Sequence, residues 1–246
     1  MSQKTYHTGP GPLAGQSFAL ATGGGPLGAM GTASGPELGT PSALQHAVWR
    51  LFDILIATAI LVLIAPFLLL LTVLLFLNDP GPVFYAHRRV GYRGRFFPCL
   101  KFRTMRTDGD EILQRYLAEN PAARRELAVT CKLRDDPRVT AVGAILRKFS
   151  LDEFPQLFNV LAGQMSIVGP RPVVLSEVER YGRQFEVYCR VRPGLTGLWQ
   201  ISGRSDVSYA TRVRMDIDYV CRKGLALDLW LLVRTIPAVA CSRGAY

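Results

Sequence analysis

One long apolar run near the N-terminus constrains the fold more than any other feature. Between Leu51 and Leu77 the only charged residue is Asp53. A helix of this length, rising about 1.5 Å per residue, can cross a hydrocarbon core of about 30 Å. Two arrangements fit: a plain transmembrane helix, which the residues alone favour, and a re-entrant helix that breaks at Pro66 and returns to the same leaflet.

This run divides the chain into three parts. Residues 1–46 are rich in Gly, Pro, Ser, Thr and Ala, and such a segment cannot bury enough apolar surface to offset its ordering entropy. We therefore expect a disordered tail over 1–46, a membrane helix over 47–78 and a cytosolic domain over 79–246. Lys4 and Arg50 balance Glu37 and Asp53, so the net charge of +10 resides entirely in the third part. The positive-inside rule places that part in the cytoplasm.

The basic residues of the third part are almost all arginine, whose planar fork suits phosphate recognition. The five cysteines lack C-x-x-C spacing, which indicates reduced, structural thiols. Three scattered histidines are too few for a zinc site. Any metal should therefore be a hard cation held by carboxylate and phosphate, namely Mg²⁺ or Mn²⁺.

The patterns of residues 79–246 predict a mostly helical α+β domain with a small β-hairpin. The hairpin strands are Val83–Val90 and Phe96–Met105, joined around Gly91–Gly94. We expect helices over 110–127, 139–148, 153–161, 177–190, 209–221 and 225–240. The last is apolar on most faces, so it suits either the core or the membrane interface, where Trp230 would be an anchor.

Candidate chemistry centres on the adjacent carboxylates Asp152 and Glu153. Pro155 is tolerated only in a first helical turn, so the pair should lie at a helix N-terminus, with Ser150 in a capping box or Asp152 as the cap. Free N–H groups there favour carboxylates and bound phosphates. Neighbours on a helix point in different directions, so one carboxylate can be a nucleophile while the other holds a cation.

Basic and glycine-rich motifs surround this pair in the sequence. Strand alternation puts Lys101 and Arg103 on one face, where they could clamp a phosphate, and Arg147 precedes the pair. Rigid or close-packed loops carry the remaining candidates: Pro170, Arg171, Pro172, Gly194, Thr196, Gly197, Gln200 and Arg204.

The chain resembles the bacterial monotopic polyprenyl-phosphate phosphoglycosyl transferases, which begin exopolysaccharide, capsule and glycoconjugate assembly. Residues 47–246 carry the resemblance through KFRTM at 101–105, LDEFPQLFNVLAGQMSIVGPRP at 151–172, RPGLTGLWQISGR at 192–204 and the D-x-x-Y-V run at 216–220. The short, exopolysaccharide-initiating members are the nearest in form.

This resemblance implies a two-step reaction at the cytoplasmic face of the bacterial inner membrane. Asp152 would be the catalytic nucleophile on a UDP-sugar and Glu153 the Mg²⁺ ligand; undecaprenyl phosphate would be the acceptor and UMP a product. Arg171 and Arg204 match phosphate-binding arginines, and Lys101, Arg103 and Arg147 are further candidates. Galactose and glucose suit the short members best.

The resemblance also implies the re-entrant membrane helix and interfacial helices, in contact with membrane lipid. Many members have Ser-Pro at the break, whereas this chain has Ala65 before Pro66 and so lacks the hydroxyl.

Two other functions are testable alternatives. The first is a non-catalytic membrane scaffold for the polysaccharide machinery. The second, nucleic-acid binding, is not expected, because no helix-turn-helix, RNA-binding sheet motif or zinc spacing is present. A homodimer is also considered, since Leu157, Phe158 and Val160 suit either a core or a dimer face.

Overall fold

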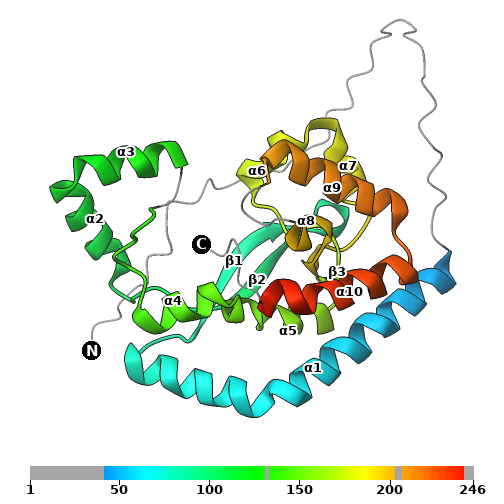
Figure 1. The fold of residues 1–246 in the computed structure, drawn as a ribbon, viewed down its shortest axis with the longest axis horizontal. Helices are drawn as coiled ribbons and strands as arrows, with labels where there is room; N and C mark the ends of the chain where they lie inside the picture. The colour runs from blue at the N-terminus through cyan, green and yellow to red at the C-terminus, as the bar shows by residue number, and fades with distance from the viewer. Residues whose placement is uncertain (1–41, 131–132, 203–206, 241–246) are drawn as a thin grey trace, which may run out of the picture. The chain divides into compact units, whose positions relative to one another are not determined.

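A computed structural model describes residues 42–130, 133–202 and 207–240 (Figure 1). The domain is mostly helical with small sheets, as the sequence predicted. The helices are α1 (Ala43–Asn78), α2 (Gly109–Glu119), α3 (Pro121–Thr130), α4 (Ala141–Lys148), α5 (Gln156–Leu161), α6 (Leu175–Tyr181), α7 (Phe185–Tyr188), α8 (Leu198–Ile201), α9 (Tyr209–Arg222) and α10 (Leu225–Ala240). The strands are β1 (Phe84–Val90), β2 (Phe96–Phe102), β3 (Ser166–Val168) and β4 (Gly194–Thr196).

The apolar run forms α1, which is long and apolar enough to cross a membrane. Its first turn is capped by Ser42. The helix continues through Pro66 and is visibly bent in Figure 1. A re-entrant break at Ala65–Pro66 therefore stays a prediction.

Asp53, the single charge in this run, has a structural role. Its Oδ1 accepts hydrogen bonds from the Ser166 hydroxyl and the Ile167 N–H, both at 2.8 Å. These contacts satisfy a buried carboxylate and tie α1 to β3.

The predicted hairpin is present, and its register brings three residues of each strand to one face. β1 and β2 pair antiparallel, with Tyr85 opposite Lys101 and His87 opposite Cys99. Directly opposed residues share a face of the sheet, so Arg89 lies on the same face as Lys101.

A second sheet was not predicted. β3 and β4 are three residues each and pair in parallel, with Ser166 opposite Gly194 and Val168 opposite Thr196. Strands this short give no readable alternation, and a parallel pair joins segments far apart in sequence.

Two of the expected long helices are wrong. The segment 110–127 forms α2 and α3, because Pro121 cannot continue α2 and starts α3 instead. The segment 177–190 is divided between α6 and α7 at Gly182, whose φ of 51° ends the first helix. In Figure 1, α2 and α3 project away from the hairpin.

The main core lies between α1, α5, the sheets and α10. Leu157 and Val160 are fully buried in it, whereas Phe158 is 47% exposed. The first two are therefore core residues rather than a dimer face. Helix α10 also has a buried side and an exposed side. Leu231 is buried, while Leu229, Trp230 and Val233 are exposed.

Candidate active site

The acidic pair lies in a short 3₁₀ turn, Leu151–Glu153, that runs into α5 through Pro155. The expected capping box is wrong. Ser150 adopts a left-handed conformation with φ of 57°, and its side chain makes no capping hydrogen bond. The chain reverses at Ser150 after α4, and this reversal orients the two carboxylates toward the β2 strand.

Asp152 is only 9% exposed, and Lys101 is its nearest described cation. The Lys101 Nζ lies 3.6 Å from the Asp152 Oδ2. Burial raises the pKa of Asp152, and the charges of Lys101 and Arg147 oppose that rise. The carboxylate therefore combines weak hydration with nearby positive charge, which favours nucleophilic attack on a polyanion.

Glu153 is held more tightly by the same lysine. Its Oε1 accepts a hydrogen bond from Lys101 Nζ at 2.6 Å and lies 3.9 Å from Arg171 NH1. Burial acts to raise the pKa of Glu153, but Lys101 and Arg171 together outweigh it and lower the pKa. The pKa values of the two neighbouring carboxylates are thus displaced in opposite directions, which indicates different roles.

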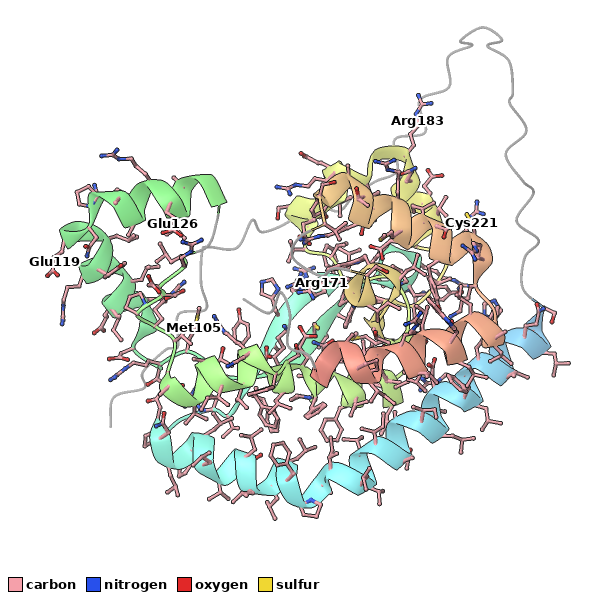
Figure 2. All side chains as sticks on the ribbon, in the orientation of Figure 1. Met105, Glu119, Glu126, Arg171, Arg183 and Cys221 are labelled. Atoms are coloured by element: carbon pink, nitrogen blue, oxygen red, sulfur yellow. The ribbon has the colours of Figure 1, made fainter. Side chains whose placement is uncertain are left out.

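Arg171 enters the site from the loop after β3. Figure 2 shows it between the hairpin and α8, and the Trp199 ring centroid lies 5.8 Å from its guanidinium carbon. The flanking Pro170 and Pro172 are buried, so the backbone on both sides of the arginine is fixed. Arg171, Lys101 and Glu153 line one pocket together with Pro172.

Two other predicted arginines occupy different positions. Arg147 donates from Nε to the Thr104 hydroxyl at 2.8 Å, which holds its charge close to Asp152. Arg103 lies beyond the end of β2 and pairs with Asp79, with NH2 3.4 Å from Oδ2. The structure therefore does not bring Arg103 to the carboxylates. Arg204 lies outside the described residues.

Close packing of two glycine-containing loops holds Arg171 in place. The Gly169 N–H donates to the Thr196 carbonyl at 2.9 Å, and the Gly194 N–H donates to the Pro170 carbonyl at 2.8 Å. A Cβ on Gly197 would lie 2.3 Å from the Gly169 carbonyl oxygen. The Thr196 hydroxyl bonds Thr235 of α10 at 2.7 Å. Gln200 lines the pocket itself.

Residues 44–242 match the family described as bacterial sugar transferase. The chain belongs to this family. It is 57% identical over 197 residues to the exopolysaccharide production protein ExoY of Sinorhizobium fredii, which covers 80% of this chain and 87% of the relative. The resemblance seen in the sequence motifs is confirmed.

The names of two further relatives specify the transfer of a sugar phosphate. The undecaprenyl-phosphate galactose phosphotransferase of Salmonella typhimurium is 48% identical, over 80% of this chain and 41% of that protein. The UDP-glucose:undecaprenyl-phosphate glucose-1-phosphate transferase of Caulobacter vibrioides is 37% identical, over 80% of this chain and 71% of its own length.

Arg89 is a residue of this sugar transferase that the sequence reasoning missed. It lines the same pocket, donates from NH1 to the Pro172 carbonyl at 3.2 Å and lies 3.8 Å from Glu177. Its charge also helps to lower the pKa of Glu153. Alternation along the predicted hairpin could have found it, because Arg89 shares the face of Lys101.

Asp216 of the transferase is a buried carboxylate that interacts electrostatically with Arg171. Its side chain is 1% exposed and accepts a hydrogen bond from the Tyr181 hydroxyl at 2.7 Å. Burial raises the pKa of Asp216 to about 7, while the hydrogen bond from Tyr181 and the positive charge of Arg171 oppose the rise. The sequence contained Asp216 within a motif but gave it no role.

Asp216 predicts a pH dependence of stability. With a folded pKa of about 7 and an unfolded value of 3.8, the folded state holds this proton more tightly. The free energy of unfolding should therefore fall as pH rises from about 4 to about 7, by up to about 4 kcal/mol for this group. Denaturant titrations across this range should show a shallower fall in Asp216→Asn than in the wild type. Parallel curves would contradict the assignment.

Proposed function

We propose that the chain transfers a hexose-1-phosphate from a UDP-sugar to undecaprenyl phosphate and releases UMP, as the first membrane step of exopolysaccharide or capsule assembly. Galactose and glucose are the proposed hexoses. The observation that carries the proposal is the buried Asp152 beside Lys101, next to the pocket that Glu153 and Arg171 line. Relatives whose names specify such transfers support it.

In the first step, an Asp152 carboxylate oxygen attacks the β-phosphorus of the donor. The bond between this phosphorus and the bridging oxygen breaks, and its electron pair leaves with UMP. The hexose phosphate is then held on Asp152 as an acyl phosphate. Lys101, Arg147 and Arg171 are close enough to balance the negative charge of the diphosphate.

In the second step, a phosphate oxygen of undecaprenyl phosphate attacks the same phosphorus. The bond to Asp152 breaks, the carboxylate is restored, and undecaprenyl diphosphate-hexose leaves. Lys101 would stabilise the returning carboxylate, because it contacts both acidic residues.

The carboxylates also suit a divalent cation. In the described part of the chain, no three His, Cys, Asp or Glu side chains gather as a preformed metal site. Mg²⁺ needs only one or two carboxylates when substrate phosphates complete its shell, and the low pKa of Glu153 keeps that ligand ionised. Bound there, Mg²⁺ or Mn²⁺ would neutralise the diphosphate and stabilise the leaving UMP.

The exposed apolar surface supports a proposed membrane arrangement. We propose that α1 enters the inner membrane from its cytoplasmic side as a re-entrant helix bent at Pro66. One stripe of α10 would lie in the interface, where Trp230 stacks with Arg234 at 5.4 Å. The stripe comprises Leu225, Leu229, Trp230, Val233 and Ile236.

The released nucleotide tests the proposal. Membranes containing the protein are incubated with UDP-galactose or UDP-glucose, Mg²⁺ and undecaprenyl phosphate, and the nucleotide products are separated. We expect UMP as the nucleotide product. When the donor carries a label on its sugar and the acceptor is omitted, we expect the label to remain on the protein. Release of UDP would indicate direct glycosyl transfer and overturn the proposal. Absence of any nucleotide product with hexose and acetamido-sugar donors would favour the scaffold alternative.

The pKa of Asp152 predicts the acid limb of the pH profile. Because the attacking carboxylate must be ionised, kcat/KM should fall as pH falls through the raised pKa of Asp152. Lys101 lowers that pKa, so Lys101→Met should move the acid limb to higher pH and reduce the plateau. Lys148→Met, at the exposed end of α4, should leave the limb in place. An unmoved limb in Lys101→Met would contradict this electrostatic role.

A further inference from the structure

Two glutamine amides near the reactive carboxylates have hydrogen-bonding groups without a protein partner. Gln156 is 3% exposed and lines the same pocket as Glu153 and Lys101. Among the described residues its side-chain amide makes no hydrogen bond. An amide that lines a pocket without a protein partner has donor and acceptor capacity left for a bound molecule.

The position of Gln156 follows directly from the helical turn. It lies three residues after Glu153 and four after Asp152, and both spacings bring its side chain close to a carboxylate on a helical turn. A group carried on Asp152 would therefore be within reach of the Gln156 amide.

Gln200 approaches the pocket from α8. Its Nε2 makes one long contact to the Leu195 carbonyl, at 3.4 Å, and its buried Oε1 has no hydrogen-bond partner. The Gly197 backbone packs against this Oε1, which limits where the amide can turn. Two amides from separate elements thus line one pocket, each with unused hydrogen-bonding capacity.

The chemistry of these groups differs from that of the cations around them. Lys101 and Arg171 supply charge for phosphate oxygens, which only accept hydrogen bonds. A glutamine amide both donates and accepts, as does a sugar hydroxyl. Leu195 and Cys99 also line this pocket.

We propose that Gln156 and Gln200 bind hydroxyl groups of the donor hexose and so contribute to sugar selection. The proposal rests on the function proposed above, because it places the hexose next to Asp152. A site whose polar groups are left unpaired by an incorrect substrate discriminates strongly against it.

Combining glutamine variants with donors that lack single hydroxyl groups tests this proposal. The variants Gln156→Met and Gln200→Met keep the side-chain length and remove the amide. Each is assayed for UMP release with the preferred UDP-hexose and with its 2-, 3-, 4- and 6-deoxy analogues. We expect each variant to lose about 10- to 100-fold in kcat/KM on the full sugar. On the one analogue that lacks the hydroxyl bound by that glutamine, the variant and the wild type should have nearly equal kcat/KM.

Matched variants separate a direct contact from general damage. Gln184→Met, at an exposed position between α6 and α7, should match the wild type on every donor. Gln156→Asn keeps the polarity but withdraws the amide, so it should show the same analogue dependence even if the methionine variant folds poorly. Equal losses on the full sugar and all four analogues would overturn the proposal. Failure of the wild type to release UMP would instead overturn the underlying function.

Discussion

Replacing Asp152 with asparagine should abolish UMP release, with a loss on the order of 10⁴-fold or more in kcat. Asparagine matches the shape of aspartate, but its amide cannot form an acyl phosphate. The variant should also fail to retain sugar label when acceptor is omitted. The measurements are nucleotide release and protein-bound label, made on membranes with equal protein content.

Two carboxylate variants make this result specific. Asp218→Asn, at a half-exposed position of α9 beside Arg222, should retain wild-type activity. Glu153→Gln should lose turnover but regain part of it at raised Mg²⁺ concentration, because one metal ligand is weakened while the nucleophile remains. Label bound to the Asp152→Asn protein at the wild-type level would refute Asp152 as the site of attachment.

Substituting alanine for Gly194 should have the largest structural effect. A Cβ at this position would lie 2.0 Å from the Gly169 nitrogen and 2.6 Å from its Cα, both backbone atoms that cannot move independently. The pairing of β3 with β4 would separate, and with it the hydrogen bond from Gly194 to Pro170. We expect a destabilisation of about 3 kcal/mol or more. Activity should also be lost, because Arg171 follows Pro170 directly in the chain and would be displaced with it.

Gly224→Ala is the matched control for this substitution. Its Cβ would meet only the Arg222 carbonyl oxygen, at 3.8 Å, which is ordinary contact. Thermal unfolding of both proteins in the same detergent should show a large fall in melting temperature for Gly194→Ala and almost none for Gly224→Ala. Similar melting temperatures would show that the two loops tolerate separation.

Local sequence rules were sufficient for several elements of the fold. The apolar run predicted α1, alternation predicted the β1–β2 hairpin, and periodicity predicted α10 with its bounds. Pro155 placed the acidic pair at the start of a helical segment. These features depend on neighbouring residues, whose dihedral and side-chain preferences act within a few positions.

The same rules failed where distant segments meet. The pairing of β3 with β4 joins residues that are almost thirty positions apart, and neither strand is long enough to show a pattern. Arg103 shares a motif with Lys101, yet its guanidinium pairs with Asp79 while the lysine reaches Glu153. Strand alternation gave the face of Lys101, whereas Arg103 lies beyond the end of β2, and it gave the partner of neither.

The sequence by itself determined the long apolar helix, the family and the adjacency of the two carboxylates, because each is encoded in contiguous residues. Only the tertiary structure decided the separate environments of Asp152 and Glu153, the placement of Arg89 and Arg171, and the unpaired amides of Gln156 and Gln200. Burial and electrostatic interaction depend on distances through space, and those distances are set when the hairpin, the β3–β4 loops and α5 pack together.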